Sequence, residues 1–66
     1  MKITLNGQNK ELATSQNLHQ IIEQFCKQSK HVIAEVNGHI IKSPRWTATT
    51  IKNGDTIELV SFVGGG

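Results

Sequence analysis

The segment Thr56-Ile57-Glu58-Leu59-Val60-Ser61-Phe62-Val63 carries the strongest β-strand pattern in this sequence. It follows the turn-forming run Asn53-Gly54-Asp55 directly and leads into Gly64-Gly65-Gly66 at the end of the chain. Side chains alternate between the two faces of a strand, so Ile57 and Leu59 share one face. We therefore expect a final strand that packs its Ile57 face against a hydrophobic core.

A β-hairpin is predicted earlier in the chain, over residues 32–41. Val32, Ala34 and Val36 have the parity of an inward face, and Ile33 and Glu35 have the opposite parity. The dipeptide Asn37-Gly38 then readily takes positive φ angles in a tight turn, and a short strand over residues 39–41 is expected to return.

A second hairpin is predicted at the start of the chain. Met1, Ile3 and Leu5 alternate with polar residues, and the turn dipeptide Asn6-Gly7 follows them. The return strand, near residues 9–13, is polar enough to form an edge of a sheet.

One helix is predicted between the two hairpins, beginning at Leu18. Asn17 offers an N-cap oxygen, and Gln20 stands three residues later, where its side chain can complete a capping box. At 100° per residue, one apolar arc forms and the opposite face is polar. The apolar arc consists of Leu18, Ile21, Ile22 and Phe25.

The composition favours a sheet in a single small domain. Of 66 residues, eight are Ile, four are Val and six are Thr, and these β-branched types prefer strands. Burying one helical stripe against one face of a mixed sheet of four to five strands gives a two-layer α+β fold. We assign residues 1–63 to this domain and residues 64–66 to a flexible tail, with Pro44 pinning an irregular turn and Trp46 covering one end of the core.

Several classes of function lack a signal in the sequence. The histidines His19, His31 and His39 do not have metal-ligand spacing, so no metal site is expected. Cys26 lies too far along the helix from His19 for a nucleophile and base pair, and is expected to pack beside the apolar arc. No catalytic side chain is predicted.

The charge and hydropathy patterns also exclude common partners. Seven Lys and Arg against five Asp and Glu give a net charge of +2 without a basic run, which predicts no nucleic-acid binding. No apolar run approaches the roughly 18 residues of a membrane span, and no signal-peptide h-region is present. With a single cysteine, the chain is expected to be cytoplasmic.

The terminal glycines are the one unusual feature. Three residues without Cβ form a narrow thread about 10 Å long, which can enter a channel that excludes side chains. The α-carboxylate of Gly66 is ionised at neutral pH and can attack a phosphoryl centre.

These features together resemble the ubiquitin-like β-grasp sulfur carriers, and among them most closely the ThiS family of thiamine biosynthesis. The resemblance rests on Gly54-Asp55-x-Ile57-x-Leu59, on Asn37-Gly38 followed by Trp46, and on the end Val63-Gly64-Gly65-Gly66. It covers the whole chain. Lys42-Ser43-Pro44 departs from the usual family pattern after the short strand.

The resemblance implies a carrier that binds no cofactor and is acted on by other proteins. An E1-like adenylating enzyme of the ThiF type would consume ATP to adenylate Gly66, and a sulfur donor such as a cysteine desulfurase would supply the sulfur of a thiocarboxylate. A thiazole synthase of the ThiG type would receive that sulfur, with Gly64 and Gly65 tethering the reacting residue. Sulfur transfer to molybdopterin or RNA, protein modification, and a plain binding module stay open as alternatives.

A docking surface is predicted on the sheet face away from the helix. By strand parity, Val60, Phe62 and Ile33 point outward and form an apolar patch next to the tail. The alternative is that the strand twists and Phe62 folds back over the core.

Overall fold

The computed structural model describes residues 1–26 and 31–62 of the chain, except for the side chain of Phe62. All predicted elements are present in the expected order. They are β1 (Lys2–Leu5), β2 (Gln8–Glu11), α1 (Leu18–Phe25), β3 (His31–Val36), β4 (His39–Ile41), the 3₁₀ turn η1 (Ser43–Arg45) and β5 (Thr56–Phe62).

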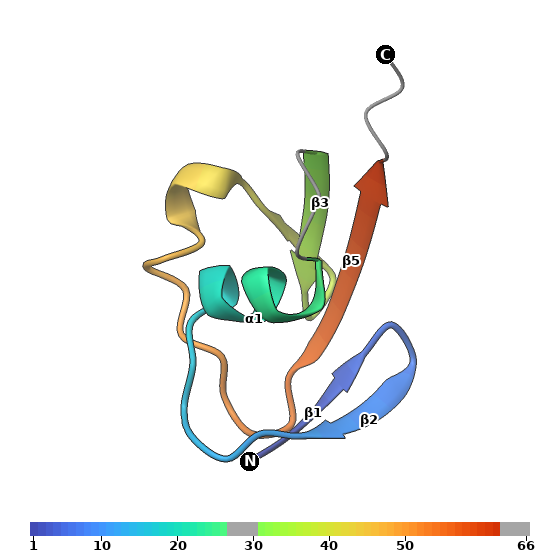
Figure 1. Cartoon of the computed structure of the whole chain (residues 1–66), viewed down its shortest axis with the longest axis vertical. Coiled ribbons are helices and arrows are strands. Elements are labelled where there is room, and N and C mark those ends of the chain that lie inside the picture. The colour runs from blue at the N-terminus through green and yellow to red at the C-terminus, as the bar shows by residue number, and fades with distance from the viewer. Residues whose placement is uncertain (27–30, 63–66) are drawn as a thin grey trace.

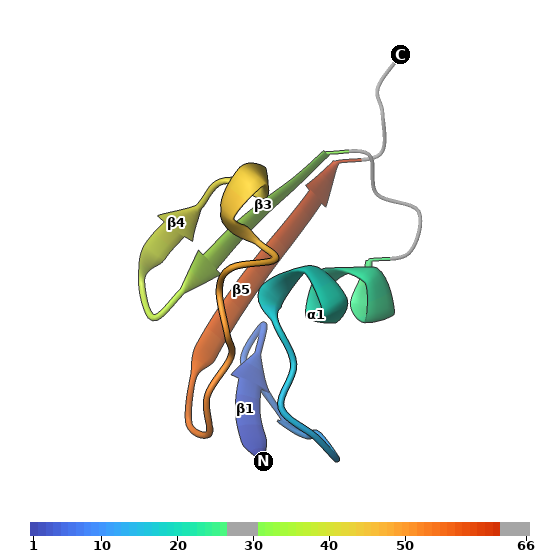
Figure 2. The ribbon, with the colours of Figure 1, turned by 90° about the vertical axis from the view of Figure 1, so that its left-hand side faces the viewer.

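A five-stranded mixed sheet forms one layer of the molecule, in the order β2-β1-β5-β3-β4 (Figure 1). The final strand β5 lies at the centre, parallel to β1 and antiparallel to β3. Both hairpins are antiparallel. Figure 2 shows α1 on one side of this sheet, so the predicted two-layer α+β architecture is confirmed.

The two asparagine-glycine turns have the backbone geometry predicted for them. Asn6 and Gly7 have φ angles of 49° and 79°, and Asn37 and Gly38 have 51° and 85°. Two successive positive φ angles give a turn whose twist matches that of the flanking strands. These turns set the pairing register of each hairpin.

The helix begins where the capping box predicts. The Asn17 Oδ1 accepts from the Gln20 backbone N–H at 2.8 Å, and the Gln20 Oε1 accepts from the Asn17 N–H at 2.9 Å. Leu18, Ile21 and Ile22 are buried as expected. The prediction that Phe25 is buried is wrong. Phe25 is 37% exposed because it is the last residue of α1, and the Lys10 ammonium lies 5.7 Å from the centroid of its ring.

The core lies between α1 and the inner face of the sheet. The inward parity of Ile57, Leu59 and Ala34 is confirmed, since each is at most 6% exposed. Val32, Val36, Cys26 and Trp46 are half-buried and pack against this core. The complete buried set is Ile3, Leu5, Leu12, Leu18, Ile21, Ile22, Ala34, Ile51, Ile57 and Leu59.

Ile51 is a core residue that the sequence patterns missed. It is 1% exposed although it lies outside every helix and strand. Its backbone N–H donates to the Gln16 carbonyl at 2.8 Å, and the Leu18 N–H donates to the Thr49 carbonyl at 2.8 Å. These long-range bonds hold the segment after η1 beside the start of α1, which buries Ile51.

The turn around Pro44 is also defined. Pro44 occupies the first turn of η1, and the indole N–H of Trp46 donates to the Ile41 carbonyl at 2.8 Å. Trp46 thus covers one end of the core, as predicted.

No helix in the described residues is long and apolar enough to cross a membrane.

Candidate functional site

The predicted reacting tail lies beyond the part of the chain that the structure describes. Gly64, Gly65, Gly66 and the domain boundary at Val63 all fall outside the described residues. The strand that carries this tail is described as far as Phe62, whose backbone pairs with His31. The described part of the candidate site therefore consists of β5 and its neighbouring strands β1 and β3.

Two turn asparagines hold β5 in place through their side chains. The Asn6 amide forms two hydrogen bonds with the backbone of Leu59: Nδ2 donates to the carbonyl at 3.2 Å, and Oδ1 accepts from the N–H at 2.8 Å. The Asn37 Oδ1 accepts from the Thr56 N–H at 2.9 Å, and its Nδ2 donates to the Asp55 Oδ1 at 3.0 Å. Sequence reasoning assigned both asparagines to turns only.

Asn6 extends the pairing of β5 beyond the end of β1. The strand register between β1 and β5 ends at Leu5 and Ile57. The Asn6 N–H then donates to the Ile57 carbonyl at 2.9 Å, and its side chain replaces a strand at Leu59. Both edges of β5 are thus hydrogen-bonded as far as Leu59, three residues before the last described residue of the strand.

The outward parity predicted for Ile33 and Val60 is confirmed. They are direct cross-strand partners on β3 and β5, and are 43% and 51% exposed. The third predicted docking residue, Phe62, has a side chain outside the described part of the structure. Whether it points outward or folds over the core stays a prediction.

Strand parity also predicted the outward positions of Glu35 and Glu58, but it predicted neither their direct pairing nor the exposure of Ile40. Ile40 on β4 is 66% exposed and lies opposite Glu35, and Glu35 lies opposite Glu58. We call the five residues Ile33, Glu35, Ile40, Glu58 and Val60 the outer patch. The turn at Asn37-Gly38 sets the β3–β4 register, so it contained the signal that would have placed Ile40 there. Figure 1 shows α1 and η1 on the other side of β3 and β5, and no described element covers this side.

The candidate nucleophiles and metal ligands do not assemble in the described residues. The His19 Nε2 lies 2.7 Å from the Glu23 Oε1 on the same helix, while His31 and His39 each begin a strand. Cys26 is half-buried just after α1. No group of three His, Cys, Asp or Glu that could hold a metal ion occurs among residues 1–26 and 31–62.

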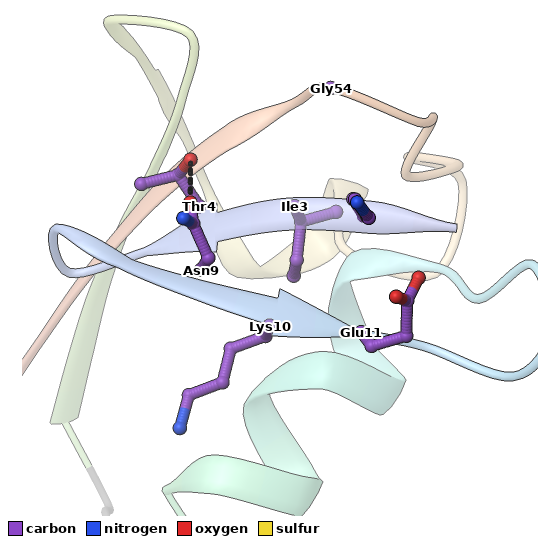
Figure 3. A pocket seen from close by; sticks show the side chains of 7 residues that line it. Ile3, Thr4, Asn9, Lys10, Glu11 and Gly54 are labelled. Atoms are coloured by element: carbon purple, nitrogen blue, oxygen red, sulfur yellow. Dashed lines mark hydrogen bonds between the residues drawn. The ribbon is translucent and has the colours of Figure 1, made fainter.

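A hollow lies over the β1–β2 hairpin (Figure 3). Some of its lining groups already pair: the Thr4 hydroxyl and Asn9 Oδ1 lie 3.5 Å apart, and Glu11 lies 3.5 Å from the N-terminal ammonium. Small-molecule sites enclose most of the ligand surface, whereas this hollow is open to solvent, so we assign it no role in the site. The lining residues are Lys2, Ile3, Thr4, Asn9, Lys10, Glu11 and Gly54.

A five-stranded mixed sheet covered on one face by a single helix defines a ubiquitin-like β-grasp domain, here with its last strand at the centre. The profile of the ThiS family matches residues 3–66. The chain therefore belongs to the ThiS family, which confirms the resemblance found in the sequence.

Comparison with individual proteins agrees with this family. The chain is 27% identical to the sulfur carrier protein ThiS of Escherichia coli K12 over 66 residues, which cover both proteins completely. The crystal structure of the thiamine biosynthesis protein ThiS from Geobacter metallireducens superposes with a TM-score of 0.83 at 32% identity, again over the full length of both chains.

A larger protein also contains a similar segment. The thiazole synthase of Paramagnetospirillum magneticum is 27% identical to this chain over 66 residues. The match covers all of this chain and 20% of that protein.

Proposed function

We propose that this chain is a sulfur carrier protein of thiamine biosynthesis whose reacting group is the α-carboxylate of Gly66. The observation that supports this most directly is the full-length similarity to the sulfur carrier protein ThiS of Escherichia coli, together with the terminal Gly64-Gly65-Gly66. The chain itself serves as a co-substrate that carries the sulfur, and partner enzymes carry out the chemistry.

The proposed chemistry uses only the terminal carboxylate. A carboxylate oxygen of Gly66 attacks the α-phosphorus of ATP, and pyrophosphate leaves, which gives an acyl adenylate. A sulfur nucleophile from a donor such as a cysteine desulfurase then attacks the acyl carbon, and AMP leaves with the C–O bond electrons. When this nucleophile is a persulfide, the product is an acyl disulfide. A thiol of a partner enzyme then attacks the donor's sulfur, the S–S bond breaks to leave the thiocarboxylate on Gly66, and the thiol and the donor sulfur become joined in a disulfide. The enzyme that binds ATP is an E1-like adenylating partner of the ThiF type.

A thiazole synthase of the ThiG type is the proposed acceptor of the sulfur. The thiazole synthase of Paramagnetospirillum magneticum contains a segment similar to this whole chain. A carrier-like segment within a thiazole synthase supports a shared reaction sequence. This similarity favours thiazole formation over sulfur transfer to molybdopterin or RNA.

A firmly held final strand that leads into three glycines in the sequence supports a carrier role. Asn6 and the neighbouring strands hold β5 as far as Leu59, and β3 pairs with β5 as far as Phe62. The glycines contribute no side chains that would obstruct a narrow channel. Ile33, Val60 and Phe62 supply the apolar side chains that dock the partner beside that channel.

The test is sulfur loading followed by intact-mass measurement. Incubation with the adenylating partner, ATP and a sulfur donor is expected to exchange one oxygen of the Gly66 carboxylate for sulfur. Cys26→Ser is the matched control, because it removes the only thiol of the chain and leaves Gly66 unchanged. Sulfur found on Cys26 in the parent protein, or loss of loading in Cys26→Ser, contradicts the carrier mechanism.

A further inference from the structure

Two glutamates face each other across the centre of the outer patch. Glu35 on β3 and Glu58 on β5 are direct cross-strand partners. Directly opposite residues of an antiparallel pair have Cβ atoms about 4.5–5.5 Å apart, and like charges in these positions destabilise a sheet. Neither carboxylate forms a salt bridge with any residue that the structure describes. The isolated protein therefore keeps an unfavourable charge pair on this face.

Exposed apolar side chains border this charge pair on two sides. Ile33 and Val60 form another pair between the same two strands, two residues along from Glu35 and Glu58. Ile40 lies opposite Glu35 on β4. Any protein that covers these three apolar side chains also removes both carboxylates from water. Burying an unpaired charge is strongly unfavourable, so such a protein has to supply cations at this position.

The charge pair also argues against other occupants of the outer patch. A second copy of this chain, docked symmetrically through the same face, would bring four carboxylates together. Nucleic acid and anionic lipid surfaces carry negative charge as well and would be repelled. A protein surface that is apolar and cationic is complementary to this face in both respects.

The adenylating partner has a physical need for such a surface. It has to bring the Gly66 carboxylate next to ATP, and both groups are anions. A cationic field around that site favours the approach of an acidic face next to the tail. Since β5 carries both Glu58 and the tail, the acidic pair reaches the partner together with the reacting carboxylate.

We propose that Glu35 and Glu58 form an acidic docking element for the adenylating partner, which presents one or two guanidinium groups to them within an apolar surface. Arginine fits this position because its planar guanidinium donates to two carboxylate oxygens at once and is weakly hydrated. This inference rests on the proposed function and specifies the partner chemistry of the same site.

The inference predicts opposite effects on stability and on binding. Glu35→Gln and Glu58→Gln are each expected to raise the thermal midpoint by about 2–5 °C, because each removes the like-charge contact. Each is also expected to weaken binding to the adenylating partner by about tenfold or more and to reduce its salt dependence. A purely structural role for these glutamates would not produce this combination.

Glu23→Gln is the matched control, since Glu23 is exposed on α1 and its replacement changes the net charge by the same amount. Binding is measured by titration calorimetry at two salt concentrations, and Gly66 loading by intact mass. The inference is supported when both patch variants bind weakly and Glu23→Gln binds like the parent. It is overturned when the patch variants bind like the parent, when Glu23→Gln weakens binding equally, or when only binding to the thiazole synthase changes.

The loading assay separates this inference from the proposed function. A parent protein that is loaded with sulfur, with patch variants that bind normally, refutes the acidic docking element alone. A parent protein that is never loaded refutes the proposed function and the inference together. Self-association of the parent through β4 that Ile40→Ser abolishes would assign the patch to a second copy and overturn the inference.

Discussion

The Asn6 side chain is expected to contribute substantially to the stability of the carrier strand. Asn6→Gly removes both hydrogen bonds to the Leu59 backbone and adds no strain, because glycine readily adopts the φ of 49° found there. Each hydrogen bond contributes about 0.5–1.5 kcal/mol net, and both are partly buried. The free energy of unfolding is therefore expected to fall by about 2 kcal/mol, which corresponds to a decrease of about 8–16 °C in the thermal midpoint.

Asn37→Gly is the matched comparison for this prediction. Asn37 also has a positive φ, of 51°, but its two side-chain hydrogen bonds are exposed, so water can replace them. The added flexibility of glycine in the unfolded chain is common to both variants and cancels in the comparison. We expect Asn37→Gly to lower the free energy of unfolding by about 1 kcal/mol less than Asn6→Gly does.

Chemical denaturation measures the two free energies, and amide hydrogen exchange measures the local effect. Asn6→Gly is expected to reduce the protection of the Leu59 N–H in particular, because the Asn6 Oδ1 is its acceptor. Equal stability losses in the two variants, or unchanged protection at Leu59, would refute the view that Asn6 acts in place of a strand.

Four other outcomes are expected. Gly65→Val should prevent sulfur loading without a change in thermal midpoint, since a branched Cβ obstructs a channel shaped for a bare thread; normal loading would remove the channel argument. Ile51→Ala should lower the free energy of unfolding by about 2–5 kcal/mol, because Ile51 is 1% exposed. A loss as small as that expected for an exposed isoleucine would contradict its position in the core. Val60→Ser should weaken binding to the adenylating partner with little change in the thermal midpoint, since Val60 is 51% exposed and the variant adds no charge to the outer patch. Phe62→Asp is also expected to weaken this binding, whereas unfolding of that variant would place Phe62 in the core.

The sequence predicts those features that depend on residues close together in the chain. The turns at Asn6-Gly7 and Asn37-Gly38 need positive φ angles that asparagine and glycine tolerate, and the structure has them. The capping box of Asn17 and Gln20 spans one helical turn and is present as predicted. Strand parity requires only alternation, so it identified the outward positions of Ile33 and Val60. The hypothesis of tail chemistry and the family resemblance also rest on residues read in order.

Only the tertiary structure decided how these elements meet. The parallel pairing of β1 with β5 joins residues more than 50 positions apart, and no local pattern specifies it. Separation in sequence also hides the bonds from Asn6 to Leu59, 53 positions apart, and the burial of Ile51 beside Gln16. The exposure of Phe25 depends on where α1 ends relative to the sheet. The opposed carboxylates of Glu35 and Glu58 exist because the pairing register places two residues face to face, and that register is a property of the assembled sheet.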